Sequence, residues 1–127
     1  MNIPEELRYT DEHEWVKLDG DIATVGITDH AQDQLGDIVF VELPSRSDSI
    51  EAQGIFGQVE AVKTVSDLFS PLTGSIVEVN EELEAHPEYV NEDAYGSGWM
   101  IKIQIDNAGA YEDLLTAKAY QDLIGEE

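Results

Sequence analysis

The primary amines are the most informative reactive groups in this 127-residue chain, because only four lysines occur: Lys17, Lys63, Lys102 and Lys118. Lys17 and Lys102 alternate with apolar residues, as solvent-facing strand residues do, and Lys118 falls on a helical segment. Lys63 differs, because residues 55–62 and 65–69 flank it and are expected to pair as a hairpin. Val62, Lys63 and Thr64 should then lie at or beside the turn, which places a single amine on a stiff projection.

An amine in that position suits the covalent attachment of a group that must travel between active sites. The long lysine stem extends the reach of such a group, while a rigid hairpin keeps it clear of the parent fold. A lysine amine is protonated at neutral pH, so an attaching enzyme would have to remove its proton. From spacing alone, an ordinary exposed strand lysine remains the simpler interpretation.

The residue types give little support for a disulfide, a metal site or a catalytic nucleophile. The chain has no cysteine, which excludes a disulfide framework, a thiolate nucleophile and a cysteine-ligated metal. The histidines His13, His30 and His86 lack the spacing of metal ligands, and each is expected to cap or to face solvent. No Gly-x-Ser-x-Gly motif of serine hydrolases occurs. We therefore expect neither an enzyme nor a metal protein.

The charge balance narrows the choice of partners. The chain has 28 acidic and 6 basic residues, which gives a formal net charge of −22. Such a surface repels phosphate backbones and anionic lipid headgroups, so nucleic acid and membranes are not expected partners. Residues 1–6 do not resemble a signal or transit peptide, and no apolar run approaches membrane-spanning length. A cytoplasmic monomer is expected.

Short strands with turn residues between them fill most of the chain. Residues 15–18 and 22–27 are predicted to form a hairpin around Asp19-Gly20. Asp29 is predicted to cap a helical turn that Gly36 ends. Residues 38–41 are continuously apolar, which predicts a strand covered on both faces.

The second half of the chain changes from strand to helix. Strands are predicted at residues 75–79 and 101–105, where Ile101, Ile103 and Ile105 alternate with polar residues. Residues 111–124 keep helical spacing, with Thr116 as a second N-cap. This order predicts a mainly β fold, a small barrel or sandwich, in a single domain of residues 1–127. Its core should span about 14–106 and its C-terminal helical segment about 108–125.

Several blocks in order resemble the glycine cleavage H-proteins. Residues 59–71, followed by Gly74, resemble the lipoylation segment of that family. The other similar blocks are residues 7–10 and 13–16, 26–31, 35–44, 90–93 with Tyr95, and 98–102. The resemblance therefore extends over nearly the whole chain, and it implies the barrel-sandwich hybrid of lipoyl and biotinyl domains, with two antiparallel sheets.

The resemblance also implies a function. Lys63 would carry lipoate, attached by a lipoate-attaching enzyme. A pyridoxal-phosphate glycine decarboxylase would load an aminomethyl group onto this arm. A tetrahydrofolate-dependent aminomethyltransferase would receive the group, and dihydrolipoyl dehydrogenase would reoxidise the arm. The chain itself would be a non-catalytic carrier in glycine catabolism.

The resemblance assigns roles to three acidic residues. Glu14 and Asp67 match positions of the cleft that shelters the loaded arm, where a carboxylate could bind a cationic amine. Glu60 matches a position that the attaching enzyme would read. A solvent-exposed carboxylate without a special role is the alternative for each. Two departures concern other positions: Ala61 replaces a common serine, and Ser47 replaces a glycine in the loop after Pro44, which puts that loop's path in doubt.

Two other carrier functions compete with this one. A lipoyl carrier that relays lipoate to other enzymes, or that serves another lipoate-dependent pathway, would have the same site. A biotin carrier is less favoured, because biotinyl segments typically flank the lysine with methionines, and here Val62 and Thr64 flank it.

Overall fold

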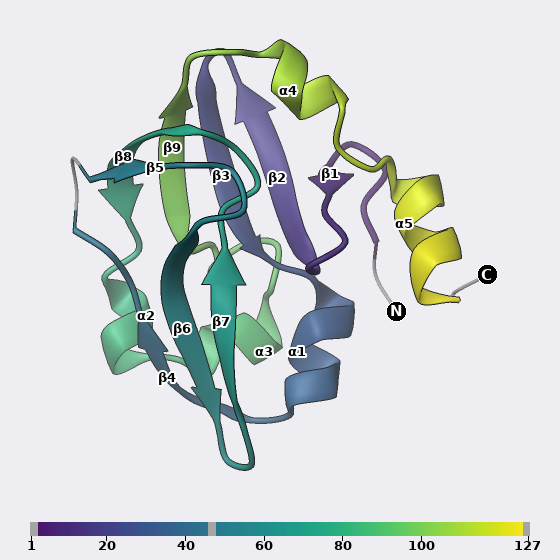
Figure 1. Cartoon of the computed structure of the whole chain (residues 1–127). Helices are drawn as coiled ribbons and strands as arrows, with labels where there is room; N and C mark the ends of the chain where they lie inside the picture. The colour runs from purple at the N-terminus through teal and green to yellow at the C-terminus, as the bar shows by residue number, and fades with distance from the viewer. Residues whose placement is uncertain (1–2, 46–47, 126–127) are drawn as a thin grey trace.

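The computed structural model describes residues 3–45 and 48–125, and in them the strands form two antiparallel sheets (Figure 1). The larger sheet has the order β1 (Arg8–Tyr9), β2 (Glu14–Asp19), β3 (Ile22–Ile27), β9 (Ile101–Ile105), β8 (Gly74–Val79) and β5 (Ser49–Ile50). The smaller sheet has the order β4 (Ile38–Glu42), β6 (Ile55–Ala61) and β7 (Val65–Phe69). The predicted mainly β fold class is confirmed. Ser47 lies outside the described residues.

The predicted hairpins are present with small changes. β2 pairs with β3 so that Asp19 faces Ile22, which leaves Gly20 and Asp21 as the turn residues. Gly20 has a φ of +67° and Asp21 does not have a positive φ, the pattern of a turn that needs glycine at its first central position. β9 alternates as predicted, with Ile101, Ile103 and Ile105 buried.

Five short helices occur in the described part of the chain: α1 (Asp29–Leu35), α2 (Glu82–Ala85), α3 (Tyr89–Glu92), α4 (Gly109–Glu112) and α5 (Ala117–Ile124). The predicted cap of α1 is wrong by one residue. Thr28, not Asp29, has extended backbone, and its Oγ1 accepts a hydrogen bond from the Ala31 amide at 3.1 Å. Gly36 ends α1 with a φ of +81°, and Thr116 caps α5, both as predicted. None of these helices is long and apolar enough to cross a membrane.

The main core lies between the two sheets, where side chains such as Val16, Val25, Val59 and Ile103 are fully buried. The prediction that residues 38–41 are covered on both faces is wrong. Ile38 and Val41 point into the core, but Val39 is 51% exposed and Phe40 is 46% exposed. An apolar run alone does not reveal whether a second layer covers the outer face of a strand.

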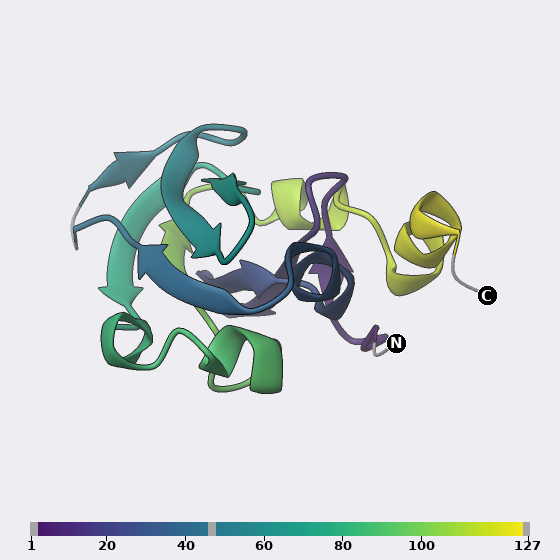
Figure 2. The same ribbon diagram turned by 90° about the horizontal axis from the view of Figure 1, so that it is seen from below.

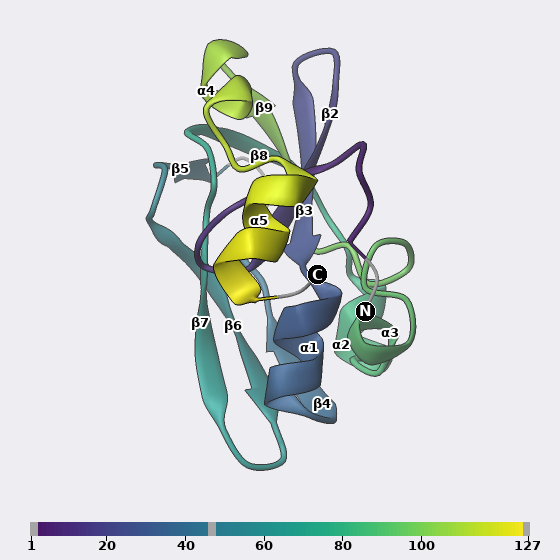
Figure 3. The ribbon, with the colours of Figure 1, turned by 90° about the vertical axis from the view of Figure 1, so that its right-hand side faces the viewer.

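A second, smaller core attaches α5 to the larger sheet. Its buried residues include Tyr9, Trp15, Ala117 and Tyr120, and the rings of Tyr9 and Tyr120 stack with centroids 4.8 Å apart. Seen from below, α5 lies at one side of the molecule and the smaller sheet at the other (Figure 2). The side view shows the β6–β7 hairpin extending beyond α1 (Figure 3). The hairpin tip is therefore the part of the smaller sheet that projects furthest.

Candidate functional site

Lys63 lies in the turn between β6 and β7, as the strand pattern predicts. Figure 1 shows this turn as the tip of the hairpin. Val62, Lys63 and Thr64 connect the strands, and the Ala61 amide donates to the Thr64 carbonyl at 2.8 Å. Lys63 is exposed. Among the described residues, none forms a hydrogen bond or an ion pair with its amine. The amine is thus accessible to an enzyme.

The loop between α1 and β4 supports this tip from one side. The Val62 amide donates to the Asp37 carbonyl at 3.2 Å. A Cβ added to Gly36 would lie 3.8 Å from Cε of Lys63, so the lysine stem passes this glycine closely. Gly36 directly follows Leu35, which lines the pocket described next. The far end of the Lys63 side chain therefore lies beside Gly36, which directly follows a pocket-lining leucine.

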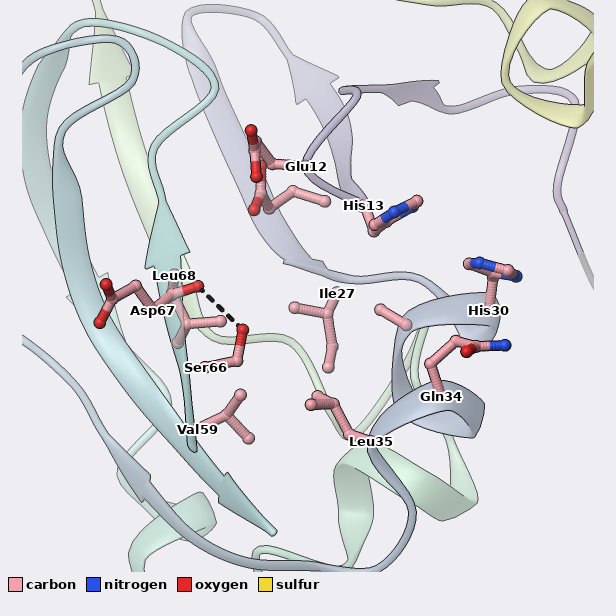
Figure 4. A pocket seen from close by; sticks show the side chains of 12 residues that line it. Glu12, His13, Ile27, His30, Gln34, Leu35, Val59, Ser66, Asp67 and Leu68 are labelled. Atoms are coloured by element: carbon pink, nitrogen blue, oxygen red, sulfur yellow. Dashed lines mark hydrogen bonds between the residues drawn. The ribbon is translucent and has the colours of Figure 1, made fainter. Parts of the chain in front are cut away.

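A pocket of about 330 Å³ lies between the start of β2, helix α1 and strand β7 (Figure 4). Its apolar side chains are Ile27, Ala31, Leu35, Val59 and Leu68. Its polar lining comes from Glu12, His13, Glu14, His30, Gln34, Ser66 and Asp67. An apolar floor with a polar rim suits a hydrocarbon chain that ends in a polar group.

Glu14 is the most perturbed group of this pocket. It is 2% exposed, and its Oε1 accepts a hydrogen bond from the Thr10 hydroxyl at 2.6 Å. Burial raises the pKa of Glu14 to about 8, although hydrogen bonds with Thr10 and the backbone of Phe69 oppose the shift. Glu14 is therefore mostly protonated at neutral pH, and a cation bound beside it would stabilise the carboxylate instead.

The two other acidic residues singled out by the sequence lie differently. Asp67 borders the pocket, but its carboxylate points away from the cavity, and it accepts a hydrogen bond from Gln58 Nε2 at 3.0 Å (Figure 4). Glu60 is exposed and lies opposite Phe40 on one side and Val65 on the other. The structure thus brings Glu14 and the backbone of Asp67 to one pocket and leaves Glu60 on the outward face of the smaller sheet.

The wall of the pocket contains a polar network that was not predicted from the sequence. The Tyr120 hydroxyl lies 2.8 Å from His13 Nδ1 and 2.7 Å from Thr28 Oγ1. The rings of His13 and His30 are 5.0 Å apart, and burial together with His30 lowers the pKa of His13. The prediction that each histidine caps or faces solvent is wrong for His13, which is half-buried with a φ of +69°. No local signal could reveal this contact, because His13 and Tyr120 are 107 residues apart.

Metal binding has no visible site in the described residues. No group of three or more histidine, aspartate or glutamate side chains in residues 3–45 and 48–125 is arranged to hold a metal ion. Glu14 bonds with the Thr10 hydroxyl and the Phe69 backbone, and His13 Nδ1 bonds with the Tyr120 hydroxyl.

Comparison with known proteins decides the family. The sequence model described as "Glycine cleavage H-protein" matches residues 7–127. The chain belongs to the glycine cleavage H-protein family. The "Glycine cleavage system H protein" of Staphylococcus carnosus is 56% identical, with 99% of this chain and 100% of that protein covered. The protein of the same name from Bacteroides thetaiotaomicron is 57% identical, with 98% of each chain covered.

A solved H-protein has the same fold. The crystal structure of a glycine cleavage system H protein from Mycobacterium marinum superposes with a TM-score of 0.89 at 41% identity, covering 97% of this chain and 99% of that one. H-proteins are the lipoyl carriers of the glycine cleavage system. The chain is accordingly a carrier subunit of that system and not a catalytic one.

Proposed function

We propose that Lys63 carries lipoate in amide linkage and that this arm shuttles an aminomethyl group between the enzymes of the glycine cleavage system. The observation that carries this proposal is the exposed, unpaired amine of Lys63 at the hairpin tip, beside the pocket rim. Bound lipoate would supply a dithiolane whose disulfide is reduced as it takes up the one-carbon group and which is left as a dithiol once that group is released. The residues of this chain bind, orient and shelter the arm.

The pocket fits the loaded arm in polarity and position. Ile27, Leu35 and Leu68 offer an apolar floor for the hydrocarbon part, and Cε of Lys63 lies beside Gly36, which directly follows Leu35. Glu14 lies at the polar part of the same pocket, where its carboxylate would accept hydrogen bonds from a cationic amine. Because burial leaves Glu14 mostly protonated at neutral pH, binding of that cation would release the proton. Sheltering the amine from water would protect the labile group.

The partners follow from the same proposal. A lipoate-attaching enzyme would modify Lys63, glycine decarboxylase would load the arm, and the aminomethyltransferase would unload it. Dihydrolipoyl dehydrogenase would then reoxidise the dithiol. Asp67 would join the cleft only if its carboxylate left Gln58 and turned inward, since it now points outward.

Lipoylation followed by intact mass and peptide mapping tests the proposal. The chain should gain one lipoyl increment on Lys63, and Lys63→Arg should gain none. Lys118→Arg is the matched control, because Lys118 is also highly exposed, with 81% of its side chain accessible, but pairs with Asp122 on α5. An increment on Lys17, Lys102 or Lys118 would contradict the proposal. A lipoylated chain that accepted no aminomethyl group from the decarboxylase would instead favour lipoate relay.

A further inference from the structure

The exposed apolar side chains are concentrated on the smaller sheet. Among the described residues, the large apolar side chains with high exposure are Val39, Phe40, Ile55, Val62, Val65 and Leu123. All except Leu123 belong to β4, β6, β7 or the hairpin turn. Single exposed apolar residues are common on proteins, but a group of them on one surface marks an interaction site.

The strand register brings two of them together beside Lys63. Phe40 of β4 faces Glu60 of β6, and Glu60 faces Val65 of β7, so the three side chains form one row across the sheet. Glu42 and Gln58 form the next row. These five residues line a groove of about 120 Å³ on the outward face. We call it the outer groove.

The outer groove and the arm pocket lie on opposite faces of the same strands. Val59, Ser66 and Leu68 line the pocket, whereas Glu60 and Val65, each adjacent to one of them, line the groove. A partner bound in the outer groove would therefore hold the hairpin without covering the pocket. Such a partner would also lie close to Lys63, because Glu60 of the groove is three residues before Lys63 in the chain.

The charge of the groove defines its partner. Glu42 and Glu60 border it, and none of the described residues that line it is a lysine or an arginine. Phe40 and Val65 supply the apolar surface, and aromatic side chains commonly carry much of an interface's binding energy. The complementary surface is an apolar side chain between lysine or arginine residues.

We propose that the outer groove docks the lipoate-attaching enzyme through an apolar side chain flanked by basic residues. This rests on the proposed function, since it assumes modification of Lys63. Enzymes that act on the loaded arm can work at the arm's full length from the hairpin. The attaching enzyme alone must bring its reacting carbonyl carbon to the Lys63 amine, and so must grip the hairpin itself. Lipoate and ATP form a lipoyl-adenylate with release of pyrophosphate. The deprotonated Lys63 amine attacks its carbonyl carbon, AMP leaves, and the nitrogen releases one proton as the amide forms.

Steady-state lipoylation of the full chain by a purified ATP-dependent lipoate-attaching enzyme tests this. For Phe40→Ser, we expect the KM for the carrier to rise about tenfold or more, with kcat changed by less than about threefold. Leu123→Ser is the matched control: Leu123 is 51% exposed, Phe40 is 46% exposed, and Leu123 lies on α5. The control should keep the wild-type KM.

A charge pair of variants tests the basic part of the partner. Glu42→Lys should raise the KM for the carrier and make that KM less dependent on salt concentration. Asp106→Lys is the control, because it changes the net charge by the same amount at an exposed position after β9, and it should have little effect on the KM. A wild-type KM for Phe40→Ser, or equal effects of Glu42→Lys and Asp106→Lys, would overturn the docking proposal alone. A wild-type chain that gained no lipoyl group at Lys63 would overturn the proposed function, and the docking proposal with it.

Discussion

Replacing Glu14 by glutamine should stabilise this protein, and increasingly so as the pH rises. The pKa of Glu14 is about 8 in the folded chain against an ordinary value of 4.5, because the side chain is buried. An acid whose pKa is raised by folding binds its proton more tightly in the native state. Its contribution to stability is therefore complete below about pH 4.5 and is lost as the pH rises toward about 8.

The size of the effect follows from that interval. Each pH unit between the two pKa values corresponds to about 1.4 kcal/mol. Glutamine has no proton to lose and keeps an oxygen that can accept the Thr10 hydrogen bond. Relative to the wild type, Glu14→Gln should gain about 3 kcal/mol in free energy of unfolding at pH 7 and about 5 kcal/mol above pH 8, with no gain at pH 4.5.

Urea unfolding of both proteins from pH 4.5 to 8.5 measures this difference. Glu51→Gln is the control, because Glu51 is exposed. Its free energy of unfolding should stay within about 0.5 kcal/mol of the wild-type value at every pH. If the free energies of unfolding of Glu14→Gln and the wild type differed by the same amount at every pH in this range, the argument from the burial of Glu14 would be refuted. The same variant should lose its aminomethyl group to hydrolysis faster once loaded, because glutamine cannot supply the negative charge that binds the cationic amine.

Two further substitutions test how the pocket and the smaller sheet are held. Tyr120→Phe keeps the stacking on Tyr9 but removes the hydroxyl that bonds with His13 and Thr28, and should cost about 1–3 kcal/mol in urea unfolding. Tyr89→Phe is the control, because the Tyr89 ring also stacks, on His86, and the loss of its hydroxyl should cost less than about 0.5 kcal/mol. Equal losses of stability in Tyr120→Phe and Tyr89→Phe would argue against the network. Gly57→Ala would drive a Cβ into the Glu42 carbonyl oxygen and should cost more than about 2 kcal/mol, measured in the same way. Gly109→Ala is the control: at the start of helix α4 the added Cβ would meet only the Asn107 side chain, at 3.1 Å, so it should cost less than about 1 kcal/mol, and a loss as large as that of Gly57→Ala would contradict the packing argument.

Features set by neighbouring residues could be predicted from the sequence. The turn around Lys63 follows from two strand-forming segments, predicted at residues 55–62 and 65–69, and only the end of the first differs, because β6 ends at Ala61. Gly20 and Gly36 mark positions where the backbone needs a positive φ, and Thr116 caps α5 through its own side chain. The one-residue error at Thr28 arose because threonine and aspartate are both good N-caps, so only the backbone conformation separates them.

Features that depend on distant segments could not be predicted. Glu14 follows two exposed residues and a histidine, and nothing local shows that it is buried. Phe40 belongs to an apolar run whose pattern is the same with or without a covering layer. The outward direction of Asp67 depends on its cross-strand neighbour Gln58. The resemblance to a family singled out Glu14 and Asp67, but only the fold gives the burial of the first and the direction of the second.

The contact of Tyr120 with His13 and Thr28 has a consequence for biosynthesis. It joins a loop near the beginning of the chain to the last helix, across 107 residues. A growing chain on the ribosome can form the β2–β3 hairpin early, but it cannot fix this wall of the pocket before residue 120 has emerged. Premature attachment of an arm to Lys63 would therefore meet a chain whose shelter is still unfinished.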